Sequence, residues 1–553
     1  MKRAEMMIIV VLTILLIVSN ILTYQFSARV ERITETTTMI TTRTETITRT
    51  EISTTTLLTT IPTTITVPTT VLTTTTITTT TPITVTRTLT VTETKPVTVA
   101  EVIGLPSPGE IQRMFPTTVT IEILDSFAGM QEHAFEEIIR AFEDYTGGKI
   151  RIERSYTDAI ISKLRLLALD GRFAEMPHIV GMIDADVAAL VAAGALEPIE
   201  EFVILAGLDP SDFQADAWRA SFIKDRQYYV PIDIQPFVLY FRLDFARQYN
   251  VSLPPPACHY YGLPCWRKPL ETREDFIEWF MDEVSKKMPL WPATPTGIVP
   301  LGLPGGGSWE FWTVVETNVF AGDGTDWDPK PAFTSEEAKK AYWFLRKIGT
   351  VPDISLFIAW WVPMDRLDAC MSNPPYAGQA RGTFLWPHGT WKIALWDFYS
   401  TQPCEYGVIP WLRETRPFAM SHVLAVTKRV TTADELTKKA ISIFLAFMFQ
   451  PKYQGLWGVY TAHAPATLGS QIYYVTLART MLGEKEANAR LMVSYQVLEY
   501  GVKYAPRHPK ISTLWTILND QIWPMTYQKD ADPDFMAEVI QDRVFREMLP
   551  LKW

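Results

Sequence analysis

Several polar side chains stand at the carboxyl ends of predicted strands, where open α/β sheets bind their ligands. Asp125 and Ser126 follow the first predicted strand, Asp184 follows the third, and Asp233 and Gln235 lie in a later extended segment. Carboxylates and amides can exchange hydrogen bonds with the hydroxyl groups of a ligand. Asp125 and Asp233 could equally cap a helix or a turn.

Tryptophans form a second set of candidate binding residues. Trp309 and Trp312 lie in GGGSWEFW, and Trp391 lies in WPHGTWKI. An indole next to hydrogen-bonding groups suits a ligand with apolar faces and a hydroxyl-bearing edge, as a sugar has. Each of these rings could instead belong to the core. The glycine run lacks the GK[ST] of a phosphate loop and is interpreted as a turn, and Glu310 within it is interpreted as a solvated carboxylate.

Catalytic, metal-binding and nucleic-acid-binding patterns are not found in the sequence. The net charge of −10 argues against a general nucleic-acid binder, which needs basic surface. The chain has no GxSxG or HExxH motif, and its seven histidines are scattered, so neither a metal site nor a cofactor is expected. A surface glycosidase with paired carboxylates stays open as an alternative.

The candidate residues belong to a segment in which strands and helices alternate. Val119, Ile121 and Ile123 alternate as in a strand. A helix follows, with apolar residues at Phe135, Ile138, Ile139 and Phe142. The continuing β-α-β-α-β-α order predicts a parallel sheet with helices on both faces, within a folded region at 113–553.

The N-terminal segment predicts a membrane anchor. Residues 6–24 carry no charge and are almost all apolar, which is close to the length that spans a bilayer. Lys2 and Arg3 precede it, so the remainder of the chain is expected outside the cell. Residues 3–6 also resemble an archaeal class III signal, cut before an apolar stretch that is retained. Residues 1–30 are therefore expected to stay attached as an anchor or signal.

Residues 31–112 are predicted to form an extended stalk. Thr occupies 35 of the 70 positions from 31 to 100, and no aromatic residue occurs there. Such a segment cannot bury enough apolar surface to fold, and Thr-rich tracts with Pro are typical of O-glycosylated stalks. An unglycosylated linker would serve the same purpose as a spacer.

Four cysteines, Cys258, Cys265, Cys370 and Cys404, allow three pairings. The pairs closest in sequence, Cys258 with Cys265 and Cys370 with Cys404, would staple loops of an extracellular domain. Four unpaired buried thiols remain the alternative.

Seven stretches of the sequence, in the same order, resemble the extracellular solute-binding proteins of family 1, which include maltose-binding protein. Together with the N-terminal segment, they resemble the archaeal, membrane-anchored type of this family. They are TVTIEILDSFAGMQEHAFEEIIRAFEDYTGGKIRIERSY, MPHIVGMIDADVAALVAAGALEPIEEF, YYVPIDIQPFVLYFRLDFARQYNV, GGGSWEFW, WPHGTWKIALW, FAMSHVLAVTK and AHAPAT. The resemblance covers residues 117–475. Arg242 departs from the family's usual Asn, and residues 251–275 are longer than a usual connection.

The resemblance implies a two-lobed, type II periplasmic-binding-protein fold. Lobe 1 would combine about 117–232 and 422–465, and lobe 2 about 233–421 and 466–553. The chain would cross between the lobes near 231–235, 418–423 and 464–467. Ligand would bind in the cleft and drive closure.

The resemblance also implies function. Trp391 matches the family's ligand-facing Trp, and Asp184 and Gln235 fall on positions that touch ligand. The expected protein is a monomeric, non-enzymatic sugar receptor of an ABC importer, working with a membrane permease and a cytoplasmic ATPase. A peptide, polyamine or anion ligand on the same fold, or a structural surface-layer protein, are the alternatives.

Overall fold

The computed structural model describes residues 104–289, 298–305, 332–350, 357–360, 383–399, 405–505, 507–527 and 532–548. All of them belong to one unit, Ala100–Trp553. The predicted anchor at 1–30 and most of the predicted stalk lie outside the described residues. Within the part that is described, no helix combines the length and apolar character needed to span a bilayer.

The first sheet has the strand order β2-β1-β3-β14-β4, with β7 pairing to β14. Its strands are β1 Val119–Asp125, β2 Ile150–Tyr156, β3 Ile179–Ile183, β4 Leu196–Glu197, β7 Tyr229–Pro231 and β14 His422–Thr427. β1 runs parallel to both β2 and β3, as the β-α-β order predicted, whereas β14 returns from far along the chain and is antiparallel.

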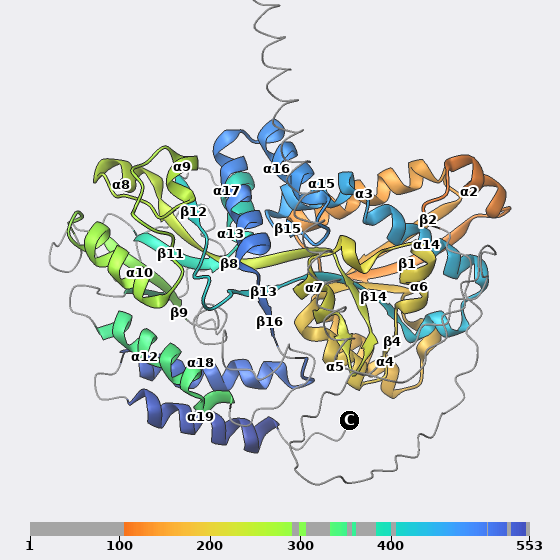
Figure 1. The fold of residues 1–553 in the computed structure, drawn as a ribbon. Helices are drawn as coiled ribbons and strands as arrows, with labels where there is room; N and C mark the ends of the chain where they lie inside the picture. Colours follow the sequence, from red (N-terminus) through yellow and green to blue (C-terminus); the bar gives the residue numbers. More distant parts are fainter. Residues whose placement is uncertain are drawn as a thin grey trace, which may run out of the picture. The chain divides into compact units, whose positions relative to one another are not determined.

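Helices cover both faces of this sheet (Figure 1). Ile121 and Ile123 of β1 share one core with Phe135 of α3 Met130–Tyr145. α14 Glu435–Met448 and α15 Pro451–Thr461 lie on the same side. Leu124 points to the opposite core, with Leu164 of α4 Ile160–Leu169 and with α5 Val187–Ala192. The alternation along β1 therefore splits its side chains between two cores.

The second sheet is built around the long, buried strand β8 Asp233–Arg242. Its order is β10-β9-β11-β8-β13-β16, with β12 and β15 also paired to β8. The other strands are β9 Val299–Gly305, β10 Phe357–Trp360, β11 Thr383–Gly389, β12 Tyr406–Ile409, β13 Phe418–Met420, β15 Ala464–Pro465 and β16 Lys503–Tyr504. Every pairing of β8 is antiparallel.

Apart from α14 and α15, the longer helices that follow β8 in sequence pack around the second sheet or against each other. α12 Glu336–Thr350, α18 Ile511–Tyr527 and α19 Pro533–Met548 lie side by side (Figure 1). Arg490 of α17 Glu484–Tyr495 is fully buried and pairs with Asp397 of α13 Trp391–Tyr399, with 2.7 Å between Nη1 and Oδ2.

The remaining main elements are α2 Pro108–Met114, α6 Glu200–Ala206, α7 Ala215–Ala220, β5 Phe222–Ile223, β6 Arg226–Gln227, α8 Leu243–Gln248, α9 Ala257–Tyr261, α10 Arg273–Trp279 and α16 Ser470–Met481.

Two features that the sequence analysis singled out, the cysteine pair and Arg242, lie beside β8 and β12. Cys258 and Cys265 form a disulfide across the end of α9, which is one of the pairings the sequence allowed. Cys370 and Cys404 lie outside the described residues. Arg242, the departure from the family pattern, precedes α8 and binds Asp244 through Nε at 2.8 Å and Nη2 at 2.6 Å.

The chain passes between the two sheets at three places, which we call the crossing segments. Ile232 joins β7 to β8, Ser421 joins β13 to β14, and Ala462 with His463 joins α15 to β15. Backbone hydrogen bonds hold them together, because Ile232 N–H donates to the His422 carbonyl at 2.8 Å and Ala466 N–H donates to the Ile232 carbonyl at 3.2 Å.

His178 links the edges of β1 and β14 in the first sheet, and it predicts a pH dependence of stability. Its Nδ1 accepts from the Glu122 backbone N–H at 3.0 Å, and burial, aided by Arg429, lowers its pKa from 6.5 to about 4. Between these values the unfolded state binds one proton more than the folded state. Stability is therefore expected to fall as the pH drops below about 6.5, by about 1.4 kcal/mol per pH unit for this group.

The His178→Asn variant retains an acceptor oxygen but cannot bind this proton. Urea unfolding at a series of pH values between about 6.5 and about 4 measures how the free energy of unfolding changes with pH. In the variant this pH dependence is expected to be weaker by the equivalent of about one bound proton. The matched control is His133→Asn, which changes an exposed histidine. An unchanged slope in His178→Asn would contradict this account.

Candidate ligand-binding site

Asp233, the first residue of β8, has a fully buried carboxylate that makes hydrogen bonds to residues in or near the three crossing segments. Its Oδ2 lies 2.7 Å from His422 Nδ1 and 2.8 Å from His463 Nδ1, and it accepts from Trp457 Nε1 at 2.7 Å. Its Oδ1 accepts from the His422 backbone N–H at 2.8 Å and from Gln235 Nε2 at 3.3 Å. One carboxylate thus holds the starts of β8 and β14 and the approach to β15.

Electrostatics keep this carboxylate ionised. Burial by itself would raise the pKa of Asp233, but attraction to His422 and His463 and their hydrogen bonds outweigh it and hold the pKa well below its usual range. Burial lowers the pKa of His463, and Asp233 opposes that effect. Phe127 packs edge-on to His422 and Trp457, at 5.2 and 5.1 Å between ring centres, and shields the group from water.

Asp233, His422 and His463 are side chains of the types that bind transition metals. The observed distances, however, are those of hydrogen bonds, because both Nδ1 atoms and the Trp457 N–H converge on the same oxygen. The sequence did not reveal this cluster, because the two histidines are 41 positions apart and far from Asp233. The other group of suitable types, Cys258, His259 and Cys265, has both sulfurs in a disulfide.

Asp184 makes a second buried link between the first sheet and a crossing segment. Its Oδ1 accepts from the Ser421 N–H at 3.0 Å, and its Oδ2 lies 2.8 Å from Arg507 Nη1. Burial raises the pKa of Asp184, and Arg507 opposes this. Burial, together with Asp184, raises the pKa of the neighbouring Asp186 to about 6, which could not be predicted from the sequence.

Asp125 and Ser126 lie at the end of β1, as predicted, but the Asp125 carboxylate and the Ser126 backbone N–H already have protein partners. Arg154 of β2 binds the Asp125 carboxylate through Nε at 2.7 Å and Nη2 at 2.9 Å, and Phe127 N–H donates to Oδ1 at 3.0 Å. Ser126 N–H donates to the Gly181 carbonyl at 3.1 Å. A ligand contact of Asp125, Ser126, Asp184, Asp233 or Gln235 stays a prediction.

Trp391 is half-buried at the first turn of α13, beside β8. Its ring packs edge-on to Phe237 at 5.5 Å and to His388 at 5.2 Å. A Cβ on Gly389 would lie 1.9 Å from Trp391 Cζ3, so only glycine permits this position of the indole. Trp309, Trp312 and Glu310 lie outside the described residues.

Residues 137–472, more than half of the chain, match the family model for bacterial extracellular solute-binding proteins. The chain belongs to this family. Members of the family are binding proteins rather than enzymes, and the chain is accordingly a solute-binding protein. No curated protein matched its sequence.

Solved structures with a two-lobed α/β fold match most of the chain. They include a cyclic α-maltosyl-1,6-maltose binding protein from Arthrobacter globiformis, at 14% identity and a TM-score of 0.56, covering 77% of this chain and 98% of that one. The GacH receptor of Streptomyces glaucescens, solved unliganded and with acarbose, matches at 15% identity and a TM-score of 0.54, covering 78% and 98%. An ABC substrate-binding protein of Listeria monocytogenes in complex with cycloalternan matches at 16% identity and 0.54, covering 78% and 99%. These matches establish the two-lobed fold that the family resemblance implied.

Replacing Asp233 tests its place at the crossing segments. Asp233→Asn removes the negative charge and places an amide where His422, His463 and Trp457 converge on one oxygen. It is expected to lower the free energy of unfolding by about 3 kcal/mol. Trp457→Phe removes one donor and is expected to cost about 1 kcal/mol. Urea unfolding measures both, with the exposed Asp170→Asn as control. A change in Asp233→Asn no larger than that of the control would show that the carboxylate does not hold the segments.

Proposed function

We propose that the protein is the extracellular receptor subunit of an ABC importer, and that it closes its two lobes around an oligosaccharide. Two of the three solved relatives are described with an oligosaccharide in complex, acarbose and cycloalternan, and the third is named for binding a cyclic maltosyl-maltose. The Listeria monocytogenes relative is described as an ABC substrate-binding protein. Separate permease and ATPase subunits would carry out transport.

The observation that carries the sugar proposal is the half-buried indole of Trp391. Gly389 and Phe237 hold the ring against β8, the strand that leads into the crossing segments. A sugar ring could stack its C–H face on the exposed part of the indole while its hydroxyls reach polar groups nearby.

Closure would be a hinge motion at the crossing segments. Three short crossings tied to Asp233 would keep the axis in place while each lobe moves as a body. A ligand that touches both lobes binds the closed form better and shifts the population toward it.

The N-terminal region would place this receptor at the outer surface of the cell, in the archaeal membrane-anchored arrangement. Residues 1–30 would anchor a single chain, and a glycosylated stalk over 31–112 would carry the domain away from the bilayer. The disulfide between Cys258 and Cys265 is in keeping with an oxidising exterior. Tethering would raise the concentration of receptor near its permease.

Calorimetric titration of the full-length protein with maltotriose and a cyclic maltodextrin tests the ligand class. Trp391→Ala is expected to weaken binding at least about tenfold, since a stacked indole contributes roughly 1.5–3 kcal/mol. Trp343→Ala, which removes an exposed indole from α12, is the matched control and is expected to leave sugar affinity unchanged.

Separate arms of this experiment test the alternatives. A tripeptide, spermidine and sulfate represent the other ligand classes, and binding of one of them without any sugar binding would refute the oligosaccharide proposal. Release of shorter sugars during incubation would indicate a glycosidase instead.

A further inference from the structure

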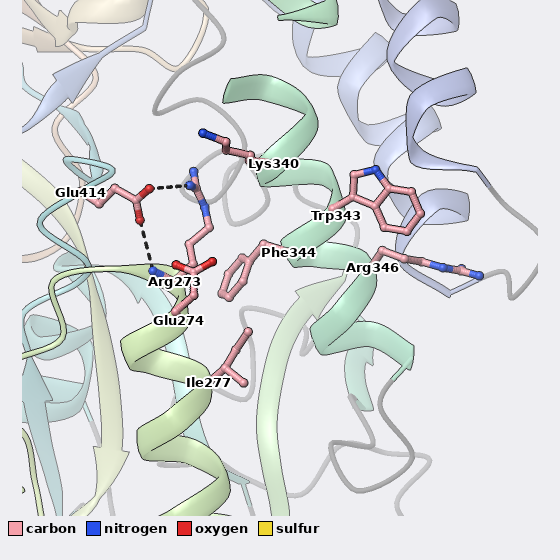
Figure 2. A pocket seen from close by; sticks show the side chains of 8 residues that line it. All are labelled: Arg273, Glu274, Ile277, Lys340, Trp343, Phe344, Arg346 and Glu414. Carbon is pink, nitrogen blue, oxygen red and sulfur yellow. Dashed lines mark hydrogen bonds and ion pairs between the residues drawn. The ribbon is translucent and has the colours of Figure 1, made fainter. Parts of the chain in front are cut away.

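A pocket of about 630 Å³ lies in the second lobe between α10 and α12. Figure 2 shows its lining, with Arg273 and Ile277 from α10, Lys340 and Phe344 from α12, and Glu414 from the segment after β12. Of the described residues that line this α10–α12 pocket, none belongs to a crossing segment or to the surroundings of Trp391. It is therefore distinct from the proposed sugar site.

The buried guanidinium of Arg273 lines the pocket and has fewer hydrogen-bond partners than donors. Its side chain is 4% exposed. Glu414 accepts from Nη1 at 3.1 Å and from the Arg273 backbone N–H at 3.2 Å. Nε and Nη2 have no hydrogen-bond partner in the described part of the chain, although both are buried. An unsatisfied buried donor costs roughly 1–3 kcal/mol, and more when it is charged.

A second cation points to the same region. The Lys340 side chain extends from α12 toward the side of the pocket where the Arg273 guanidinium ends (Figure 2). Lys340 forms an ion pair with Glu337 at 3.1 Å, and both side chains are more than half exposed, so this pair stabilises little. Including Arg346 and Glu274, three cations and two carboxylates line the pocket, and Glu414 is already bound to Arg273.

The missing partner of such a guanidinium is an oxyanion. Adjacent N–H groups of arginine match the two oxygens of a carboxylate or phosphate, and the bond is charge-assisted. Ile277 and the buried Phe344 give the pocket an apolar wall, which suits an anion attached to a small organic body.

We propose that the α10–α12 pocket is a second binding site, for a small anion whose carboxylate or phosphate is bound by Arg273 and Lys340. This site is separate from the one in which the sugar is proposed to bind, and it does not depend on the sugar proposal.

Calorimetric titration of the full-length protein with inorganic phosphate and, separately, with citrate tests this proposal at low ionic strength. Arg273→Gln is expected to weaken binding at least about tenfold, and Lys340→Gln about three- to tenfold. The control is Lys339→Gln, which makes the same charge change one position away on α12 outside the pocket lining, and its effect should stay below about twofold.

Each outcome decides the proposal. Binding of phosphate alone or of citrate alone identifies the anion class and supports the site, provided that Lys340→Gln weakens it and Lys339→Gln does not. Lys340→Gln changes an exposed side chain and keeps the test valid even if Arg273→Gln fails to fold. Absence of binding for both anions, or equal losses in Lys339→Gln and Lys340→Gln, would overturn the proposal.

Discussion

The carboxylate of Asp233 is the interaction on which the joint between the two lobes depends. A buried charge is tolerated only when donors surround it, and here the donors come from His422, His463, Trp457 and Gln235. Because these residues lie in or near different crossing segments, satisfying one charge also fixes where each segment passes. The requirement is local, but it determines the relation of elements that are more than 200 positions apart in the sequence.

A second layer of ion pairs extends this arrangement outward. Asp184 joins the end of β3 to Ser421 and Arg507, and Asp125 joins β1 to Arg154 of β2. The polar groups at the strand ends therefore serve the architecture first. Ligand recognition in this protein is expected to draw more on partly exposed side chains, of which Trp391 is the best-defined example.

The sequence predicted the parts of the fold that depend on local periodicity. The alternation in β1 and the apolar spacing in α3 identified both elements, and their order predicted the parallel pairing of β1 with β2 and β3. It also placed Asp125 and Asp184 at strand ends. It could not show that Arg154 and Arg507 occupy those carboxylates, because such partners are brought together only by the folded chain. The contact of His422 and His463 with Asp233 could not be predicted for the same reason. Clusters that bind a metal or share hydrogen bonds are recognised in a sequence only when the spacing of their residues is short and regular.

The two fully buried arginines beyond the family match have a consequence for how this chain can be shortened. The match ends at residue 472, yet Arg490 neutralises Asp397 in the helix that begins with Trp391, and Arg507 neutralises Asp184 in the first lobe. A fragment ending at the family boundary would leave two interior aspartates without counter-ions. The C-terminal segment is thus an integral part of the receptor's electrostatic interior, and a fragment that keeps both ion pairs has to extend beyond residue 507.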